Sequence, residues 1–249
     1  MSVKTILVSQ PKPESEKSPY FDLADKYKLK IDFRPFINIE GITSREFRDQ
    51  KIELSKHTAV IFTSKTAVDH FFRISEETRF KVPDALKYFC MSEAVAYYLQ
   101  KYVVYRKRKI FFGKQNISDL MDVLKKHKDE KFLLPCSDIL RQRIPDTLEE
   151  NSITFTKLML YRTVASDLSD LEDVKYDLLV FFSPSGIESL LKNFPEFKQD
   201  KTKIAAFGPT TANAVKKYNL RLDIHAPQPQ APSMSMAIEQ FIKHNKKKS

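Results

Sequence analysis

The chain has 249 residues, of which 42% are hydrophobic and 30% charged, with a formal net charge of +10. This length and apolar content allow one large or two ordinary globular domains. No apolar run approaches the roughly 20 residues that span a bilayer, and the short apolar start does not predict a signal peptide, so we expect a cytoplasmic protein with no membrane partner.

The positive charge is spread too evenly to predict a nucleic-acid-binding protein. Residues 39–162 carry a formal charge of +6 and the rest of the chain +4, without the single basic stripe of a duplex binder. The one dense basic patch, at 106–109, is explained equally well by a ligand site and by a solvated turn before a strand. The overall sign favours an anionic small substrate through electrostatic steering.

Strand-like apolar runs alternate with helical patterns along the chain. Alternation of this kind predicts α/β lobes in which helices cover both faces of a doubly wound parallel sheet. Near-continuous apolar strands, such as the one at 178–182, agree with burial on both faces. The predicted strands lie at 5–9, 58–63, 88–91, 109–112, 132–136, 178–182, 204–207 and 222–225.

The two halves of the chain repeat one another where a strand passes into a helix. Thr58–Phe72 matches Asp177–Leu191, which aligns Ser64 with Ser183 at an offset of 119 residues. Two further pairs follow in the same order at offsets of 116 and 117: segment 88–99 with 204–215, and the helix opened by Ser118 with that opened by Ser235. The repeat predicts two similar lobes.

Two extended stretches interrupt the strand–helix alternation at equivalent places, near 30–38 and 155–164. Each is long enough to leave one lobe and enter the other, so we expect a two-stranded linker. The first lobe would then combine residues 1–36 and 164–249, and the second would comprise residues 38–160. An active cleft between the two lobes is expected.

Cysteines and histidines give no signature of a metal site. Cys90 and Cys136 each end an apolar run without C-x-x-C spacing, so buried reduced thiols are favoured over catalysis or metal binding. The five histidines show neither H-x-x-x-H nor H-E-x-x-H spacing. We therefore expect neither a metal nor histidine chemistry.

Five short motifs, taken in order, resemble the uroporphyrinogen-III synthase family over nearly the whole chain. Members of that family are cofactor-free cytosolic lyases of tetrapyrrole and heme biosynthesis with two α/β lobes, and for this chain we expect a monomer by default. They close hydroxymethylbilane to uroporphyrinogen III, inverting ring D with loss of water, so the resemblance implies this substrate and activity. The motifs are Phe62–Ser64, Tyr161–Thr163, Phe182–Gly186, Phe207–Ala212 and Ala231–Ser235.

The chain departs from the family pattern at three places. Gln10 stands where an arginine is usual, Ser92 where a glycine is frequent, and Cys136 begins the segment that matches R-G-x-x-x-R, of which only Arg141 keeps its charge. These departures leave a second hypothesis open, a catalytically silent tetrapyrrole- or anion-binding protein of the same fold.

Hydroxyl residues at helix starts are the candidate substrate-binding groups. The substrate that the resemblance implies carries eight carboxylates, and a helix start offers unpaired N–H groups and a partial positive charge to anions. For each hydroxyl the alternative is a cap of its own helix, and for each glycine it is close packing. The candidates are Ser64, Ser183, Ser185, Gly186, Gly208, Thr210, Thr211 and Ser235.

Tyr161 is the one side chain that the resemblance singles out for proton chemistry. In the linker its phenol would donate a hydrogen bond to the leaving hydroxyl of the bilane. The alternative is an aromatic side chain that packs against one lobe. Strand alternation directs the neighbouring Arg162 to the opposite side.

Overall fold

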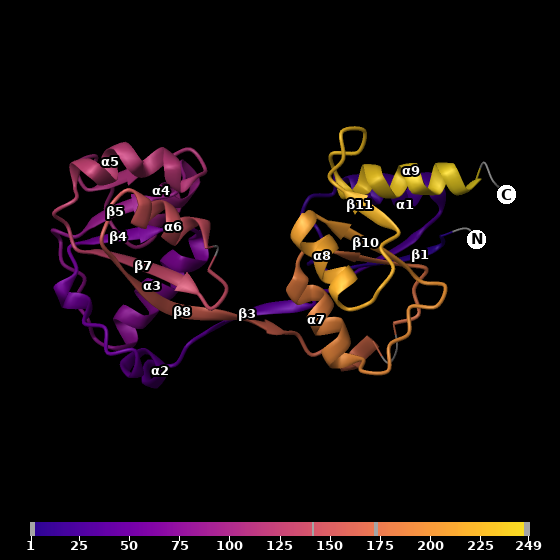
Figure 1. Cartoon of the computed structure of the whole chain (residues 1–249), viewed down its shortest axis with the longest axis horizontal. Coiled ribbons are helices and arrows are strands. Elements are labelled where there is room, and N and C mark those ends of the chain that lie inside the picture. Colours follow the sequence, from indigo (N-terminus) through magenta and orange to yellow (C-terminus); the bar gives the residue numbers. More distant parts are fainter. Residues whose placement is uncertain (1–2, 141, 172–173, 247–249) are drawn as a thin grey trace. The chain divides into compact units, whose positions relative to one another are not determined.

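The computed structural model describes residues 3–140, 142–171 and 174–246, so Arg141 lies outside the described residues. The chain forms two compact units (Figure 1). Unit 1 consists of Met1–Asn38 and Val164–Ser249, and unit 2 of Ile39–Thr163. The chain therefore passes from one unit to the other twice.

Unit 1 is built on a five-stranded sheet, sheet A, with the strand order β11-β10-β9-β1-β2. All four neighbouring pairs in this sheet are parallel. Its elements are β1 (Thr5–Val8), α1 (Pro19–Tyr27), β2 (Lys30–Phe33), a 3-10 turn (Ser169–Leu171), β9 (Leu178–Phe181), α7 (Pro184–Asn193), β10 (Lys203–Phe207), α8 (Pro209–Lys217), β11 (Ile224–Ala226) and α9 (Met234–Lys246).

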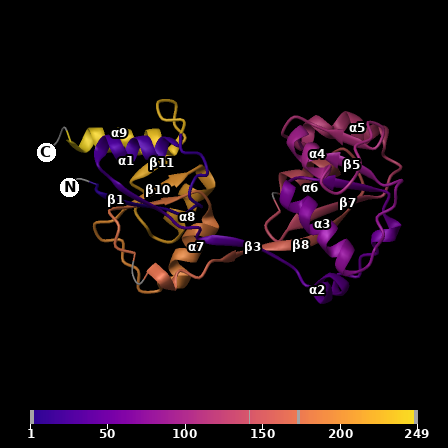
Figure 2. The same cartoon turned by 180° about the vertical axis from the view of Figure 1, so that it is seen from behind.

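Helices cover both faces of sheet A. Alternate strand residues point to opposite faces of the sheet. Ile6 belongs to the core beneath α1 and α9, whereas Leu7 belongs to the core beneath α7 and α8. Both side chains are almost fully buried. Figures 1 and 2 show α1 beside α9 on one face of the unit. Unit 1 is thus the doubly wound layer that the strand–helix alternation predicts.

Unit 2 is built on a mixed six-stranded sheet, sheet B, with the order β3-β8-β7-β4-β5-β6. The pairs from β8 to β6 are parallel. Its elements are β3 (Ile37–Gly41), α2 (Ser44–Asp49), a 3-10 turn (Leu54–Lys56), β4 (Ala59–Phe62), α3 (Lys65–Glu77), β5 (Lys87–Cys90), α4 (Glu93–Leu99), β6 (Ile110–Phe112), a 3-10 turn (Ile117–Leu120), α5 (Met121–Lys126), β7 (Phe132–Ser137), α6 (Arg143–Glu150) and β8 (Phe155–Ala165).

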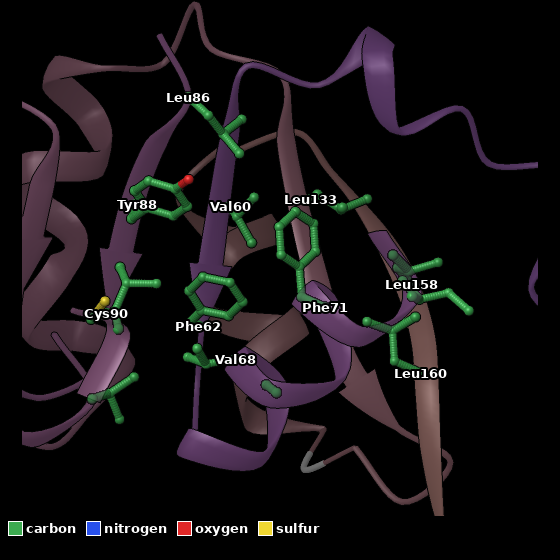
Figure 3. Packing of buried hydrophobic residues seen from close by; sticks show 14 of the residues in the cluster. Val60, Phe62, Val68, Phe71, Leu86, Tyr88, Cys90, Leu133, Leu158 and Leu160 are labelled. Atoms are coloured by element: carbon green, nitrogen blue, oxygen red, sulfur yellow. The ribbon is translucent and has the colours of Figure 1, made fainter. Parts of the chain in front are cut away.

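Sheet B also has a buried core on each face. On one side α3 packs across the strands, and Figure 3 shows Phe71 of this helix between Val60 and Leu133, in the cluster that also contains Leu158. The rings of Phe62 and Phe71 meet edge to face at 5.6 Å between centroids. On the other side α5 and α6 cover the alternate residues of the same strands. The parallel arrangement of β8 to β6 therefore has the layered form expected from the sequence.

The extended stretch near 30–38 contains two strands instead of one. Its first part, β2, is the edge strand of sheet A and pairs in parallel with β1. Pro35 has no N–H to donate and interrupts the ladder after Phe33. Its second part, β3, begins at Ile37 and lies next to β8 in sheet B.

Each sheet changes winding direction at one point. In sheet A this point lies between β1 and β9, because β1 leads to β2 on one side and β9 leads to β10 on the other. In sheet B it lies between β4 and β7 for the same reason. Ligands of open α/β sheets bind at the carboxyl ends of the strands beside such points. The carboxyl ends of β1 and β9 in sheet A, and of β4 and β7 in sheet B, are therefore the expected positions of functional side chains.

Candidate functional site

Where sheet A changes winding direction, between β1 and β9, the sequence places small hydroxyl residues beside a helix start. Ser183 follows β9 with extended backbone, and its Oγ accepts a hydrogen bond from Gly186 N at 3.2 Å. A Cβ atom at Gly186 would lie 3.4 Å from Phe181 and 3.7 Å from Ser9 Oγ. A Cβ atom at Gly186 would therefore make ordinary van der Waals contacts, so close packing does not require glycine at this position. Ser185 lies in the same first turn, half-buried.

The next helix start, that of α8, is not capped by a side chain. Gly208 occupies the cap position with φ 84° and ψ 156°, a conformation available almost only to glycine, and a Cβ atom there would meet open space. Thr210 is exposed, whereas Thr211 is only 1% exposed. Neither hydroxyl caps the helix.

Thr211 carries a buried polar atom without a partner. Among the described residues, no group forms a hydrogen bond with its Oγ1. An unsatisfied hydroxyl in a folded interior costs about 1–3 kcal/mol. The first turn of α8 therefore combines free space beside the backbone of Gly208 with the Thr211 hydroxyl, which has no hydrogen-bond partner among the described residues.

The helix α9 begins earlier than Ser235, the residue expected from the sequence to open it. Met236 N donates to Ser233 Oγ at 3.3 Å, so Ser233 supplies the cap. Ser235 is buried within the first turn, with its Oγ 3.1 Å from that of Ser233. Likewise, the turn assigned to Ser118 is capped by Asn116. The period of the apolar residues locates a helix start only to within about two residues.

In unit 2, two predicted site residues from distant parts of the sequence lie together. Ser64 caps α3, accepting from Ala67 N at 3.1 Å. Its Oγ lies 3.4 Å from the phenolic oxygen of Tyr161 on β8. Tyr161 lies opposite Ser137, the last residue of β7, and is 8% exposed. Ser64, Tyr161 and the adjoining His70 are called the Tyr161 cluster below.

His70, which the sequence analysis set aside, packs on the Tyr161 ring. The two rings stack at 5.0 Å between centroids, with 19° between their planes. Arg73 Nε donates to His70 Nδ1 at 3.2 Å, which places the proton of the neutral imidazole on Nε2. Burial and the nearby Arg73 charge lower the pKa of His70, so the neutral ring is favoured.

Gly41 was the sequence signal for this packing. A Cβ atom there would lie 2.7 Å from Arg73 Nη2 and 2.9 Å from the His70 ring. Only glycine lets β3 pass this close to α3 without displacing both side chains. In a chain with four glycines, a glycine within an extended stretch indicates close approach of another element.

The Tyr161 phenol stays protonated in this environment. Burial raises its pKa, and the hydrogen bond with Ser64 offsets only part of this effect. Arg162 points the other way and pairs with Glu46 of α2. The strand alternation predicted from the sequence accounts for this separation. Tyr161 therefore offers a neutral hydrogen-bond donor at the carboxyl edge of sheet B.

The three departures noted in the sequence occupy ordinary structural positions. Gln10 is exposed, and Ser92 caps α4 by accepting from Val95 N at 3.4 Å. Cys136 is buried, with Sγ 3.6 Å from Leu158 O. Burial raises the pKa of Cys136 to about 11 and that of Cys90 to about 12. Both thiols are thus protonated at neutral pH and unsuited to nucleophilic attack.

Within the part of the chain that the structure describes, no three His, Cys, Asp or Glu residues lie together in a way that could hold a metal ion. Over the same residues, no helix has the length and apolar character to cross a membrane.

Comparison with known proteins gives one consistent result. A family model described as Uroporphyrinogen-III synthase HemD matches residues 21–235. The chain is 26% identical to a uroporphyrinogen-III synthase of Chlorobaculum parvum, over 97% of this chain and 100% of that protein. It is 24% identical to a protein of the same name from Schizosaccharomyces pombe, over 98% and 99% of the two chains.

Solved structures show the same fold. The uroporphyrinogen-III synthetase of Helicobacter pylori superposes with a TM-score of 0.62 at 17% identity, over 97% of this chain and 99% of that one. A mutant uroporphyrinogen III synthase of Thermus thermophilus gives 0.54 at 15% identity, over 97% and 99%.

Proposed function

Because the chain belongs to the uroporphyrinogen-III synthase family, we propose that it closes hydroxymethylbilane to uroporphyrinogen III. The observation that carries this proposal is the family match, which extends over residues 21–235 and so includes both units. The silent-binder hypothesis is not favoured by these relatives. The positions that raised it, Gln10, Ser92 and Cys136, have structural roles or face solvent.

The reaction requires little covalent chemistry from the protein. The C–O bond of the hydroxymethyl group breaks, and the hydroxyl leaves as water after receiving a proton, which gives an azafulvene cation. The substituted carbon of ring D attacks this cation to form a spiro intermediate. Fragmentation and reclosure then invert ring D, and loss of a proton restores the pyrrole. Since the pyrroles supply the electrons, the protein contributes positioning and electrostatic stabilisation.

Tyr161 is our proposed donor to the leaving hydroxyl. The phenol is neutral and lies at the carboxyl edge of sheet B. Among the described residues its one hydrogen-bond partner is Ser64, at the long distance of 3.4 Å. A hydrogen bond this long is weak and can be replaced by one to the substrate. The positive charge that develops on the bilane favours a neutral donor over a cationic one.

The substrate carboxylates are proposed to bind at helix starts. The candidates are the first turns of α3, α7 and α8, each of at least nine residues, so that the partial charge at the N-terminus is developed. Ser64, Ser183 and Thr211 are the hydroxyls concerned. The net charge of +10 supports attraction of this polyanion. The predicted cleft concerns the placement of the two units and stays a prediction.

The proposal also includes that the protein is a monomer and lies in the cytosol. Both cysteines are free buried thiols, which fits a reducing compartment. The chain supplies its candidate groups without a second copy.

The test is a ring-closure assay with the purified protein and freshly made hydroxymethylbilane, in chelator and without added cofactor. We expect the type III isomer, in a proportion that rises with protein concentration. Without protein the bilane closes spontaneously to the type I isomer, which serves as the internal control. If type I remains the product at every protein concentration, the silent-binder hypothesis replaces the proposal.

Changes at His70 are expected to act through Tyr161. His70→Ala removes the stacked ring and should lower kcat by roughly tenfold, because a misplaced catalytic group loses its orientation. His70→Phe keeps an aromatic ring at the same place and should retain most of the activity. In a Tyr161→Phe background, His70→Ala should cause little further loss. Equal losses with and without the Tyr161 hydroxyl would mean that His70 only stabilises the fold.

A further inference from the structure

A second candidate site lies at the edge of sheet B opposite to the Tyr161 cluster. A pocket of 390 Å³ opens there beside the first residues of β5 and β6. Tyr88 and Ile110 mark this edge, since each stands at the beginning of its strand. Ser64 and Tyr161, by contrast, lie where β4 and β7 end. The pocket is therefore separate from the proposed catalytic groups, and its volume falls in the range of about 300–1,000 Å³ usual for small-molecule sites.

The walls of the pocket are apolar and partly aromatic. They include Phe72, Val82, Tyr88, Tyr102 and Ile110. In Figure 3, Tyr88 lies on β5 beside Leu86, on the side of the sheet that carries the Phe62 and Phe71 core.

One wall of the pocket is held in a fixed orientation. The rings of Phe72 and Tyr102 stack at 4.4 Å with 2° between their planes. The Tyr102 hydroxyl donates to Asp69 at 2.5 Å, and Tyr98 donates to the same carboxylate at 2.9 Å. Lys101 lies over both tyrosine rings. Because these contacts are all made between side chains of unit 2, they hold the wall in place independently of a ligand.

The polar groups of the pocket favour an anion. Its lining contains two cations, Arg106 and Lys109, and one carboxylate, Asp84. Lys109 is already engaged, since its Nζ donates to the carbonyl oxygen of Asp84. No ion pair joins Arg106 to a carboxylate within residues 3–140, 142–171 and 174–246. Arg106 is thus the group available to a bound carboxylate.

The mouth of the pocket carries exposed apolar surface. Val104, a residue of the lining, is 78% exposed and lies two positions before the basic residues 106–109. Within the pocket, the hydroxyl of Tyr88 remains a donor, because burial raises the pKa of this phenol.

We propose that this pocket binds a small aromatic carboxylate, with its ring among the apolar walls and its carboxylate on Arg106. This explains why the one dense basic patch of the chain, left open by the sequence, borders an apolar pocket. The site is independent of hydroxymethylbilane chemistry, so binding can be measured without turnover.

The first experiment compares 4-nitrobenzoate with its neutral analogue 4-nitrobenzamide by titration calorimetry on the full chain. We expect the carboxylate to bind at least tenfold more tightly. Arg106→Gln should weaken carboxylate binding by roughly tenfold, since a charge-assisted hydrogen bond is lost. Lys107→Gln removes the same charge from a residue outside the lining and should change the affinity less than twofold. Equal effects of the two changes, equal affinities of the two compounds, or no binding would each overturn the proposal.

The second experiment locates the ligand. The chain contains ten tyrosines but no tryptophan, so Val104→Trp introduces a single tryptophan, which can be excited selectively, at the mouth of the pocket. Tyr97→Trp places one at a side chain that is 76% exposed and outside the lining. We expect 4-nitrobenzoate to quench the fluorescence of Trp at 104 saturably, with the calorimetric affinity, and to quench Trp at 97 only by collision. Saturable quenching at 97 alone would place the ligand elsewhere and overturn the proposal.

Discussion

Replacing Tyr161 by Phe is expected to lower kcat for type III formation by up to about 100-fold without unfolding the protein. The change removes only the phenolic oxygen, whose one hydrogen bond within the described part of the chain is with Ser64 at 3.4 Å. The ring stays stacked on His70, so the packing of β8 against α3 is kept. Loss of a general-acid group costs 10²–10⁴-fold in rate. We expect the lower end, because water or a substrate carboxylate can deliver the proton instead.

The pH profile tests whether the Tyr161 phenol remains protonated in the working range. Burial raises the pKa of Tyr161 above its ordinary value, so the phenol remains a donor throughout the neutral and mildly alkaline range. The ratio of wild-type to Tyr161→Phe activity should therefore be constant between about pH 7 and pH 9. Steady-state kinetics on both proteins provide the measurement, with circular dichroism as the control for folding. Unchanged turnover would remove Tyr161 from the chemistry. Loss of activity together with an altered circular dichroism spectrum would make it a packing residue.

The repeat carried most of the fold information in the sequence. Matching Thr58–Phe72 with Asp177–Leu191 predicts two equivalent strand-to-helix turns, and Ser64 and Ser183 do cap α3 and α7 in the same way. A parallel strand buried on both faces leaves a continuous apolar run, which makes it easy to recognise. The stretch near 30–38 was predicted as one extended segment, and β2 could not be assigned to sheet A, because pairing with β1 depends on tertiary contacts.

The candidate site was predicted less completely, for a physical reason. The cap of α9 is Ser233, not Ser235, since in a run of small polar residues the backbone conformation selects the cap. His70 was missed because stacking with Tyr161 joins residues far apart in the chain, and no local spacing records it. Thr211 was expected to bind the substrate, with a cap of α8 as the alternative. Its hydroxyl does not cap α8 and has no partner among the described residues, so substrate binding stays a prediction.

Replacing Thr211 by Val should make the protein more stable and less active at the same time. The change exchanges a buried hydroxyl without a partner for a methyl group of similar shape, which should raise the free energy of unfolding by about 1 kcal/mol. If a substrate carboxylate bound at the start of α8 supplies the missing partner, its loss should raise KM by roughly tenfold, as for a hydrogen bond to a charged group. Thermal unfolding and ring-closure kinetics on the same preparation measure both effects.

Thr211→Ser is the matched control, because it keeps the hydroxyl and removes the methyl group from a side chain that is 1% exposed. The small cavity should lower the free energy of unfolding by about 1 kcal/mol while KM stays near the wild-type value. The two variants therefore predict opposite shifts in stability and in KM. A cap role would instead make Val the less stable variant, since losing a cap costs about 1 kcal/mol. Stabilisation by Val with unchanged KM would identify the Thr211 hydroxyl as an uncompensated polar group with no part in substrate binding.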